Sequence, residues 1–354
     1  MKSDRQLEKM TFFRIKDVNG RAYRIDFQGE SSIDAGGPYR DSIVNVVTEM
    51  ESGLVPLLIK SPNNRNEHGA NRDCFVLDPS STSPSHLEMY RFLGGFIACG
   101  ILSKAPIPLN LSPSVWKQIL GLPLTLADLD AFDAYSAQVL TDLRKHSKSL
   151  SDEEFKETIS QNFTTVLSNG DEVILCDGGT DRMVQKSDID EFIDLVLKAR
   201  ASEATEQVKA IQDGMSTVLM GNLDMISYLT PEAIEIRACG EKTVQIELLK
   251  SITEYQRCSA DHEAIQRFWR VIESFSHEER MLYLKFVWGR NRLPIDLSNC
   301  QKHKIVFMDH MADQGFPQSH TCFFQLDLPF YKNDEIARKR ILSAAIICGE
   351  VDTD

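Results

Sequence analysis

The most regular pattern of apolar and polar positions lies in the middle of the chain. Five apolar residues recur there at spacings of three and four, which places them on one face of a predicted α-helix: Ile189, Phe192, Ile193, Val196 and Leu197. Ser187 and Asp190 predict a capping box at the start of this helix. The apolar run 173–175, followed by turn-forming residues 177–179, predicts a short strand before it.

Helical patterns return near the C-terminus. One apolar helix face is formed by Ile265, Phe268, Trp269 and Ile272. Ser276 and Glu279 predict the cap of the next helix, and Gly289 predicts its end.

Strand patterns follow these helices. Residues 305–308 predict one strand, and the alternation of Phe324, Leu326 and Leu328 predicts a second that Pro329 ends. Asn333 or Asp334 is expected to cap a final helix that ends at Gly349. Together these elements predict a small α+β unit at the end of the chain.

A polar segment separates the two regions. Thr230 and Pro231 open a predicted helix that Gly240 ends, and residues 240–243 contain no apolar side chain. A chain of 354 residues is also too long for one compact core. We therefore predict a domain over residues 1–240, a hinge over residues 241–243 and a second domain over residues 244–354. The candidate hinge residues are Gly240, Glu241 and Lys242.

Composition excludes several classes of protein. The net charge of −13 argues against a nucleic-acid binder, which would show a basic stripe. The longest apolar stretch, residues 92–102, has about half of the ~20 residues that a membrane span needs, so we expect a buried helix and no membrane insertion. The polar start of the chain does not resemble a signal peptide.

Cysteine usage predicts a reducing compartment. The eight cysteines show no paired spacing, so they are expected to be free thiols in the cytoplasm or the nucleus. Cys300, His303 and His310 could begin a metal site, but no second ligand pair follows. We therefore expect no metal and no other cofactor.

The segment with the most informative chemistry is residues 319–329. Cys322 lies at the entry of the predicted strand, with His320 two residues before it and Asp327 five residues after it. A thiolate is a good acyl acceptor and leaving group, and a neighbouring imidazole can favour it. A carboxylate can help to deprotonate an incoming amine.

A structural interpretation competes with the catalytic one. If the strand already includes Cys322, then alternation places this residue on the same face as Phe324 and Leu326. It would then be an ordinary buried cysteine, as most free cysteines are. Periodicity alone favours that interpretation.

The segment resembles the active-site signature of the HECT ubiquitin ligases, in which a His-Thr-Cys-Phe run precedes Leu-x-Leu-Pro and a tyrosine, here Tyr331. Weaker similarities extend along most of the chain, at Phe27–Glu30, Ile33–Gly37 and Phe286–Pro294. The last of these, with the Phe323–Phe324 pair, is most similar to the HERC-type subgroup.

The resemblance implies an α+β fold with two lobes, a large and mostly helical N-terminal one and a small C-terminal one, joined by a flexible hinge. It also implies that Cys322, in a loop before the strand, accepts ubiquitin from a conjugating enzyme as a thioester and passes it to a substrate lysine. Thr321 and His320 would shape the loop and the thiolate, and Asp327 would orient and deprotonate the lysine.

The same resemblance places the conjugating enzyme in a hydrophobic groove of a subdomain over about 142–222 of this sequence. Phe192 would line this groove, and Leu140, Leu143 and Phe155 are further candidates. From the helix pattern alone, Phe192 is a core residue. Tyr90 is the one residue that corresponds to an exposed ubiquitin-binding tyrosine patch of some members.

Two departures from the family pattern concern Val351, at a position where many members carry a docking phenylalanine, and Phe316, where a leucine is usual. Two alternative functions also fit the residues. One is a cysteine hydrolase that acts on ubiquitin thioesters, and the other is a binding scaffold in which Cys322 is inert.

Overall fold

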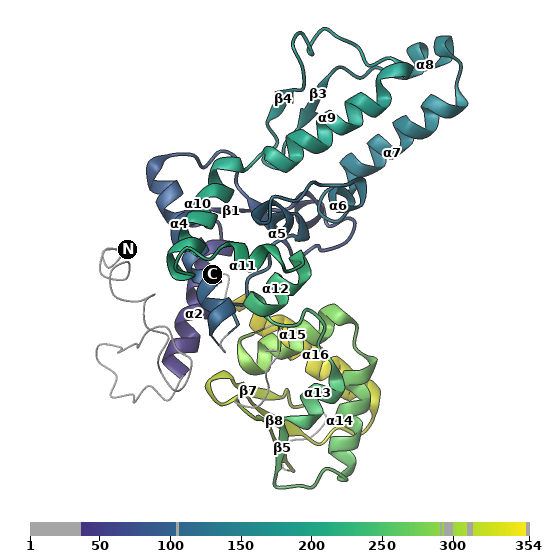
Figure 1. The fold of residues 1–354 in the computed structure, drawn as a ribbon. Helices are drawn as coiled ribbons and strands as arrows, with labels where there is room; N and C mark the ends of the chain where they lie inside the picture. The colour runs from purple at the N-terminus through teal and green to yellow at the C-terminus, as the bar shows by residue number, and fades with distance from the viewer. Residues whose placement is uncertain (1–36, 104–105, 291, 294–299, 310–313, 352–354) are drawn as a thin grey trace. The chain divides into compact units, whose positions relative to one another are not determined.

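The computed structural model describes residues 37–103, 106–290, 292–293, 300–309 and 314–351 (Figure 1). The predictions for Phe27–Glu30, His310 and Pro294 lie outside these residues. The described residues divide into two compact units, one with residues 48–99 and 109–235, the other with residues 37–47, 100–103, 106–108 and the described part of 236–351. No described helix is both long and apolar enough to cross a membrane.

Up to residue 239 the described chain is mainly helical, with two small antiparallel sheets. The first part contains α2 (Gly37–Glu51), β1 (Leu58–Lys60), α3 (Pro62–Arg65), β2 (Phe75–Leu77), α4 (Pro84–Leu102), α5 (Pro113–Ile119) and α6 (Leu126–Asp130). The remainder consists of α7 (Ala134–Ser149), α8 (Asp152–Thr158), β3 (Thr164–Val166), β4 (Glu172–Ile174), η1 (Lys186–Asp188), α9 (Ile189–Ser202), α10 (Thr205–Val218), α11 (Asp224–Ser227) and α12 (Pro231–Cys239).

Two glycines let α4 and α10 approach each other closely. A Cβ atom on Gly94 would lie 1.9 Å from the carbonyl oxygen of Ile211, and one on Gly214 would lie 1.8 Å from that of Arg91. Only glycine permits such backbone contact without displacing a helix. Most of the apolar run 92–102 is buried in α4, as its pattern predicts, although Leu102 at the end of the helix is 50% exposed.

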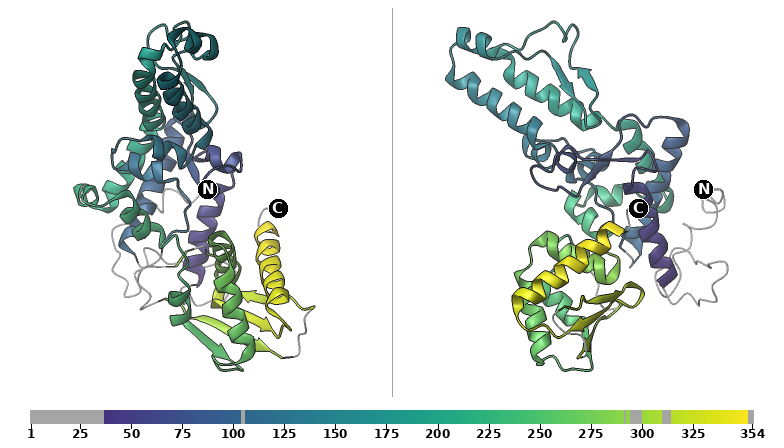
Figure 2. Two further views of the ribbon diagram at one scale, coloured as in Figure 1. Left: turned by 90° about the vertical axis from the view of Figure 1, so that its right-hand side faces the viewer. Right: turned by 180° about the vertical axis from the view of Figure 1, so that it is seen from behind.

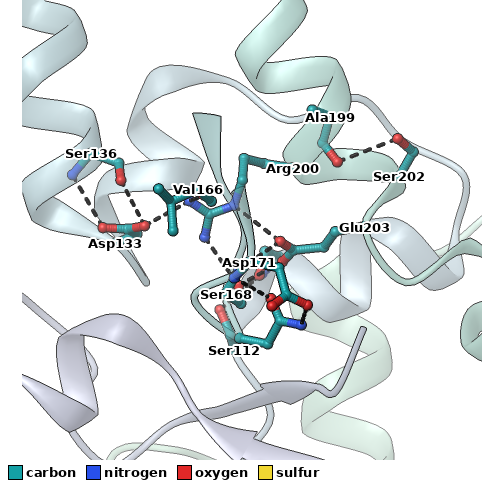
Figure 3. A network of polar contacts seen from close by, with 12 residues as sticks. Ser112, Asp133, Ser136, Val166, Ser168, Asp171, Ala199, Arg200, Ser202 and Glu203 are labelled. Atoms are coloured by element: carbon teal, nitrogen blue, oxygen red, sulfur yellow. Dashed lines mark hydrogen bonds and ion pairs between the residues drawn. The ribbon is translucent and has the colours of Figure 1, made fainter. Parts of the chain in front are cut away.

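A buried arginine ties together the elements of the subdomain that contains α7, β3, β4 and α9 (Figure 3). The guanidinium of Arg200, at the end of α9, is fully buried and lies 2.7 Å from the Asp133 carboxylate and 3.1 Å from that of Glu203. It also donates to the Ser168 hydroxyl and to the backbone carbonyl of Val166. Because a buried charge is costly unless it is paired, the loss of either carboxylate would destabilise this arrangement.

Within the second unit, the described part of residues 246–351 forms the small α+β structure that the sequence predicts. Its sheet has the order β5-β6-β8-β7, with β5, β6 and β8 parallel and β7 antiparallel to β8. The helices α15 and α16 lie side by side (Figure 2). The elements are α13 (Ile246–Ser251), β5 (Thr253–Gln256), α14 (Glu263–Ser274), α15 (His277–Trp288), β6 (His303–Met308), β7 (Gln318–His320), η2 (Thr321–Phe323), β8 (Gln325–Pro329) and α16 (Asp334–Val351).

Several local predictions are confirmed and others are wrong. Ser276 and Glu279 form the predicted capping box of α15, and Gly289 ends that helix with a φ of 70°. The predicted box of Ser187 and Asp190 is wrong, because the 3₁₀ turn η1 precedes α9 and Asp188 accepts from the Gln185 amide instead. Gly349 does not end α16, which continues to Val351.

Candidate functional site

Cys322 lies in the short turn η2, between the edge strand β7 and the strand β8. Because β8 begins only at Gln325, this cysteine does not belong to the strand whose alternation would place it in the core. Leu326 and Leu328 on that strand are buried, whereas Phe323, next to Cys322, is 60% exposed. The structure thus agrees with a cysteine that precedes the strand.

Phe324 closes the turn. It has a left-handed backbone conformation, with φ 49° and ψ 49°, and its amide donates to the carbonyl of Thr321. Its ring is fully buried and stacks on Trp288 with 4.4 Å between the centroids. Side chains with a Cβ atom rarely adopt this conformation, so the packing of the ring must hold it.

The structure brings His320 and Asp327 together. Nε2 of His320 lies 3.2 Å from one carboxylate oxygen of Asp327. The other carboxylate oxygen accepts a hydrogen bond of 2.8 Å from the side-chain amide of Gln325. The pair spans β7 and β8, where His320 lies opposite Gln325. The imidazole is 47% exposed and the carboxylate 14%. These hydrogen bonds therefore hold the carboxylate in place near the surface.

Thr321 is the first residue of the turn and is exposed. Its backbone carbonyl accepts a hydrogen bond from the Phe324 amide, and the proposed role of its side chain stays a prediction. The sequence analysis did not single out Gln325. Its position two residues before Asp327 on one strand places both side chains on the same face, and this spacing could have indicated it.

The four residues predicted to line a partner groove are all buried: Leu140, Leu143, Phe155 and Phe192. Phe192 makes an edge-on contact with Phe163, with 5.6 Å between the ring centroids. A side chain that is 2% exposed cannot serve as an accessible anchor in this conformation. The structure therefore assigns Phe192 to the core, as its helix pattern alone predicts.

Tyr90 is also corrected by the structure. Its side chain is fully buried, and its hydroxyl donates to the carbonyl of Leu57 and accepts from the amide of Asp78. Burial raises the pKa of this phenol. Tyr90 therefore supports the packing of α4 and offers no exposed surface to ubiquitin.

The backbone of the predicted hinge segment is anchored at Leu293. Gly240 has a φ of 87°, and a Cβ atom there would lie 2.5 Å from the carbonyl oxygen of Leu293. The amide of Glu241 donates to the same oxygen over 3.0 Å. The absence of apolar side chains from this segment therefore does not leave its backbone unattached.

His303 is not available as a metal ligand. Its two ring nitrogens lie 2.9 Å from the hydroxyl oxygens of Thr253 and Tyr283, so both are occupied by hydrogen bonds. Among the described residues, no group of His, Cys, Asp and Glu side chains is arranged to hold a metal ion.

Comparison with known proteins gives a consistent family match. The sequence model of the HECT-domain (ubiquitin-transferase) family matches residues 42–350. E3 ubiquitin-protein ligase HERC2 from Mus musculus and from Homo sapiens is 37% identical over 338 residues, which cover 94% of this chain. E3 ubiquitin-protein ligase HUWE1 from Mus musculus is 29% identical over 350 residues, or 95% of this chain. The chain spans 7–8% of the length of these relatives.

Proposed function

Because the chain belongs to the HECT-domain family of ubiquitin transferases, we propose that it acts as a ubiquitin-protein ligase with Cys322 as the residue that carries ubiquitin. The observation that supports this most is the position of Cys322 in a turn outside the sheet, two residues after His320, whose side chain meets that of Asp327. The names of the relatives, which are E3 ubiquitin-protein ligases, support the same activity.

The proposed reaction has two acyl transfers. The thiolate of Cys322 attacks the carbonyl carbon of a ubiquitin thioester on a conjugating enzyme, and the thiolate of that enzyme leaves. The amine of a substrate lysine then attacks the new thioester, and the thiolate of Cys322 leaves while the amine loses a proton. An ordinary lysine has a pKa of ~10.4, so about one in a thousand is nucleophilic at neutral pH, and a nearby base accelerates this step.

Asp327 is the base that the geometry favours for the second step. Its carboxylate is fixed by hydrogen bonds with His320 and Gln325. A carboxylate held in this way needs little reorganisation when an amine approaches it.

The conjugating enzyme is proposed to dock on the subdomain of α7, β3, β4 and α9. The four buried residues pack in the core of this subdomain, so the proposed contact lies on its surface. Val166 and Ile174 lie on the same face of the β3–β4 hairpin, because Thr164 is opposite Ile174 and Val166 is opposite Glu172. Both apolar side chains are more than half exposed. Exposed neighbouring apolar residues are typical of a protein-binding surface.

We also propose that the protein is located in a reducing compartment. The described cysteines carry no disulfide bond, and they include Cys74, Cys99 and Cys239 in the core. Free thiols of this kind are usual in the cytoplasm and the nucleus.

The direct test of the proposed activity mixes the chain with ubiquitin, activating enzyme, ATP and a panel of conjugating enzymes. We expect a ubiquitin adduct of the chain on a non-reducing gel that disappears on reduction. Release of free ubiquitin without any adduct or conjugate would instead indicate a hydrolase. No change in any ubiquitin species would indicate a binding scaffold.

Asp327→Asn is expected to leave the charging of Cys322 near normal and to slow the discharge of ubiquitin onto lysine. Asparagine keeps an oxygen that can accept from Gln325 or His320, but it cannot take up the proton. The defect should be largest below about pH 8 and should be partly rescued at higher pH, where more free amine is present. Single-turnover discharge onto free lysine, measured over a range of pH, checks this expectation.

The matched control is Glu254→Gln, which removes an exposed carboxylate from the opposite edge of the same sheet. It should change neither step. An equal loss of charging and discharge in Asp327→Asn would show that Asp327 shapes the loop and is not a base.

Bending of the segment Gly240–Thr243 is proposed to let the thioester meet the conjugating enzyme and then a substrate. Lys242→Pro fixes φ at one position of the segment and preserves the hydrogen bond from Glu241 to Leu293. We expect a fall in ubiquitin transfer of at least about tenfold, which corresponds to ~1.4 kcal/mol. Lys242→Ala serves as the control, and transfer at the normal rate in the proline variant would exclude a hinge here.

A further inference from the structure

A buried histidine, His303, packs against Phe324, the residue that ends the turn carrying Cys322. His303 is the first residue of β6, and its side chain is completely buried. Its ring lies 4.9 Å from the ring of Phe324, centroid to centroid. The proposed reaction uses neither of these residues, although Phe324 is only two residues from Cys322.

The hydrogen bonds of His303 fix one tautomer. The hydroxyl of Thr253 donates its single proton to the carbonyl of Leu249 over 2.6 Å, so its oxygen must accept from Nδ1–H of His303. Nε2 then accepts from the hydroxyl of Tyr283, which is also fully buried. Burial lowers the pKa of His303 to about 3, so the imidazole is neutral at physiological pH.

The fixed imidazole forms one wall of the site that holds the Phe324 ring, and Trp288 forms another. Trp288 stacks nearly parallel to Phe324, with 7° between the ring planes. The residue after His303 also binds the backbone, because the amide of Lys304 donates to the carbonyl of Phe324 over 2.8 Å. Residues 303 and 304 therefore hold both the ring and the backbone of Phe324.

These contacts explain how a phenylalanine keeps a left-handed backbone at this position. Such a conformation persists only where the surroundings determine it strongly. Phe324 ends the turn, since its amide closes a hydrogen bond to Thr321 across Cys322 and Phe323. If the ring were released, Phe324 could return to an extended conformation and the turn would open.

We propose that His303 and Phe324 are positioning residues, which set the conformation of the turn that carries Cys322. The imidazole, oriented by Thr253 and Tyr283, supports the ring of Phe324, and the ring in turn holds the left-handed closure of the turn. The consequence for ubiquitin transfer rests on the proposed function, whereas the consequence for the turn itself does not.

Tyr283→Phe tests the proposal with the smallest change, because it removes one hydroxyl and leaves the core volume almost unchanged. We expect the chain to stay folded and the amide of Phe324 to exchange with solvent at least about tenfold faster. Charging of Cys322 with ubiquitin should fall by a similar factor, about tenfold. Hydrogen exchange of single amides, followed well below the melting temperature, and single-turnover charging measure the two effects.

Tyr255→Phe is the matched control. It also removes one hydroxyl from the same unit, in this case the partner of Trp269 Nε1. A purely structural role predicts that both variants lower the melting temperature and leave the exchange of the Phe324 amide unchanged in the folded protein. That result for Tyr283→Phe would overturn the proposal.

Phe324→Leu is a second variant that does not depend on the buried hydroxyls. Leucine keeps an apolar side chain in the core, but it has no aromatic ring to stack on Trp288, and a side chain of this kind disfavours the left-handed conformation. We expect the chain to fold and charging to fall about tenfold, and charging at the wild-type rate would overturn the role of the ring. If the wild-type chain shows no charging at all, the proposed function fails, but faster exchange in Tyr283→Phe would still support the positioning role.

Discussion

Cys322→Ala is expected to abolish the reducible ubiquitin adduct completely, because alanine has no nucleophile to form the thioester. Cys322→Ser should instead trap ubiquitin as an oxyester, which resists thiol reductants but is cleaved by alkali. Non-reducing and reducing gels of the charging reaction, followed by an alkaline wash, distinguish these outcomes.

Cys258→Ala is the matched control for this experiment. Cys258 is a partly exposed cysteine of the same unit, and burial raises the pKa of its thiol, which lowers the fraction of reactive thiolate. Its removal should leave charging unchanged. A ubiquitin adduct that persists in Cys322→Ala would refute the central assignment and would require another acceptor.

Phe192→Ala is expected to destabilise the subdomain of α7, β3, β4 and α9. Its side chain is 2% exposed and packs against Phe163, so its loss leaves a cavity in the core. Removal of a buried phenylalanine side chain typically lowers the free energy of unfolding by ~3–5 kcal/mol. Thermal melting followed by circular dichroism measures the effect.

The contrasting expectation is that Phe192 is a groove anchor, whose loss costs ~2 kcal/mol or more of binding and leaves the fold intact. Val139→Ala is the control, since Val139 lies on α7 with 53% of its surface exposed. It should leave the melting temperature unchanged. Normal melting of Phe192→Ala combined with lost affinity for the conjugating enzyme would show that Phe192 belongs to the binding surface and not to the core.

The predictions that held depended on residues close together in the chain. The capping box of Ser276 and Glu279 and the apolar face of α14 are both present in the structure. The strand β6 was also predicted, although it begins two residues earlier, at His303. The strands β5 and β7 were not predicted, because each is only three or four residues long and carries polar side chains.

The sequence by itself determined the helices with regular apolar faces and the α+β character of the second unit. Through its resemblance to the HECT family, it also indicated Cys322, His320, Thr321 and Asp327. Spacing along the chain carries this information, because caps and helix faces depend on side chains within about four residues of one another.

Only the tertiary structure decided which of these residues meet and which are accessible. Pairing of β7 with β8 brings His320 within hydrogen-bonding distance of Asp327, and packing against Phe163 buries Phe192. The left-handed conformation of Phe324 depends on Trp288 and His303, which are 36 and 21 residues away in sequence (324 − 288 and 324 − 303). Burial and strain arise from such distant neighbours, which no local pattern specifies.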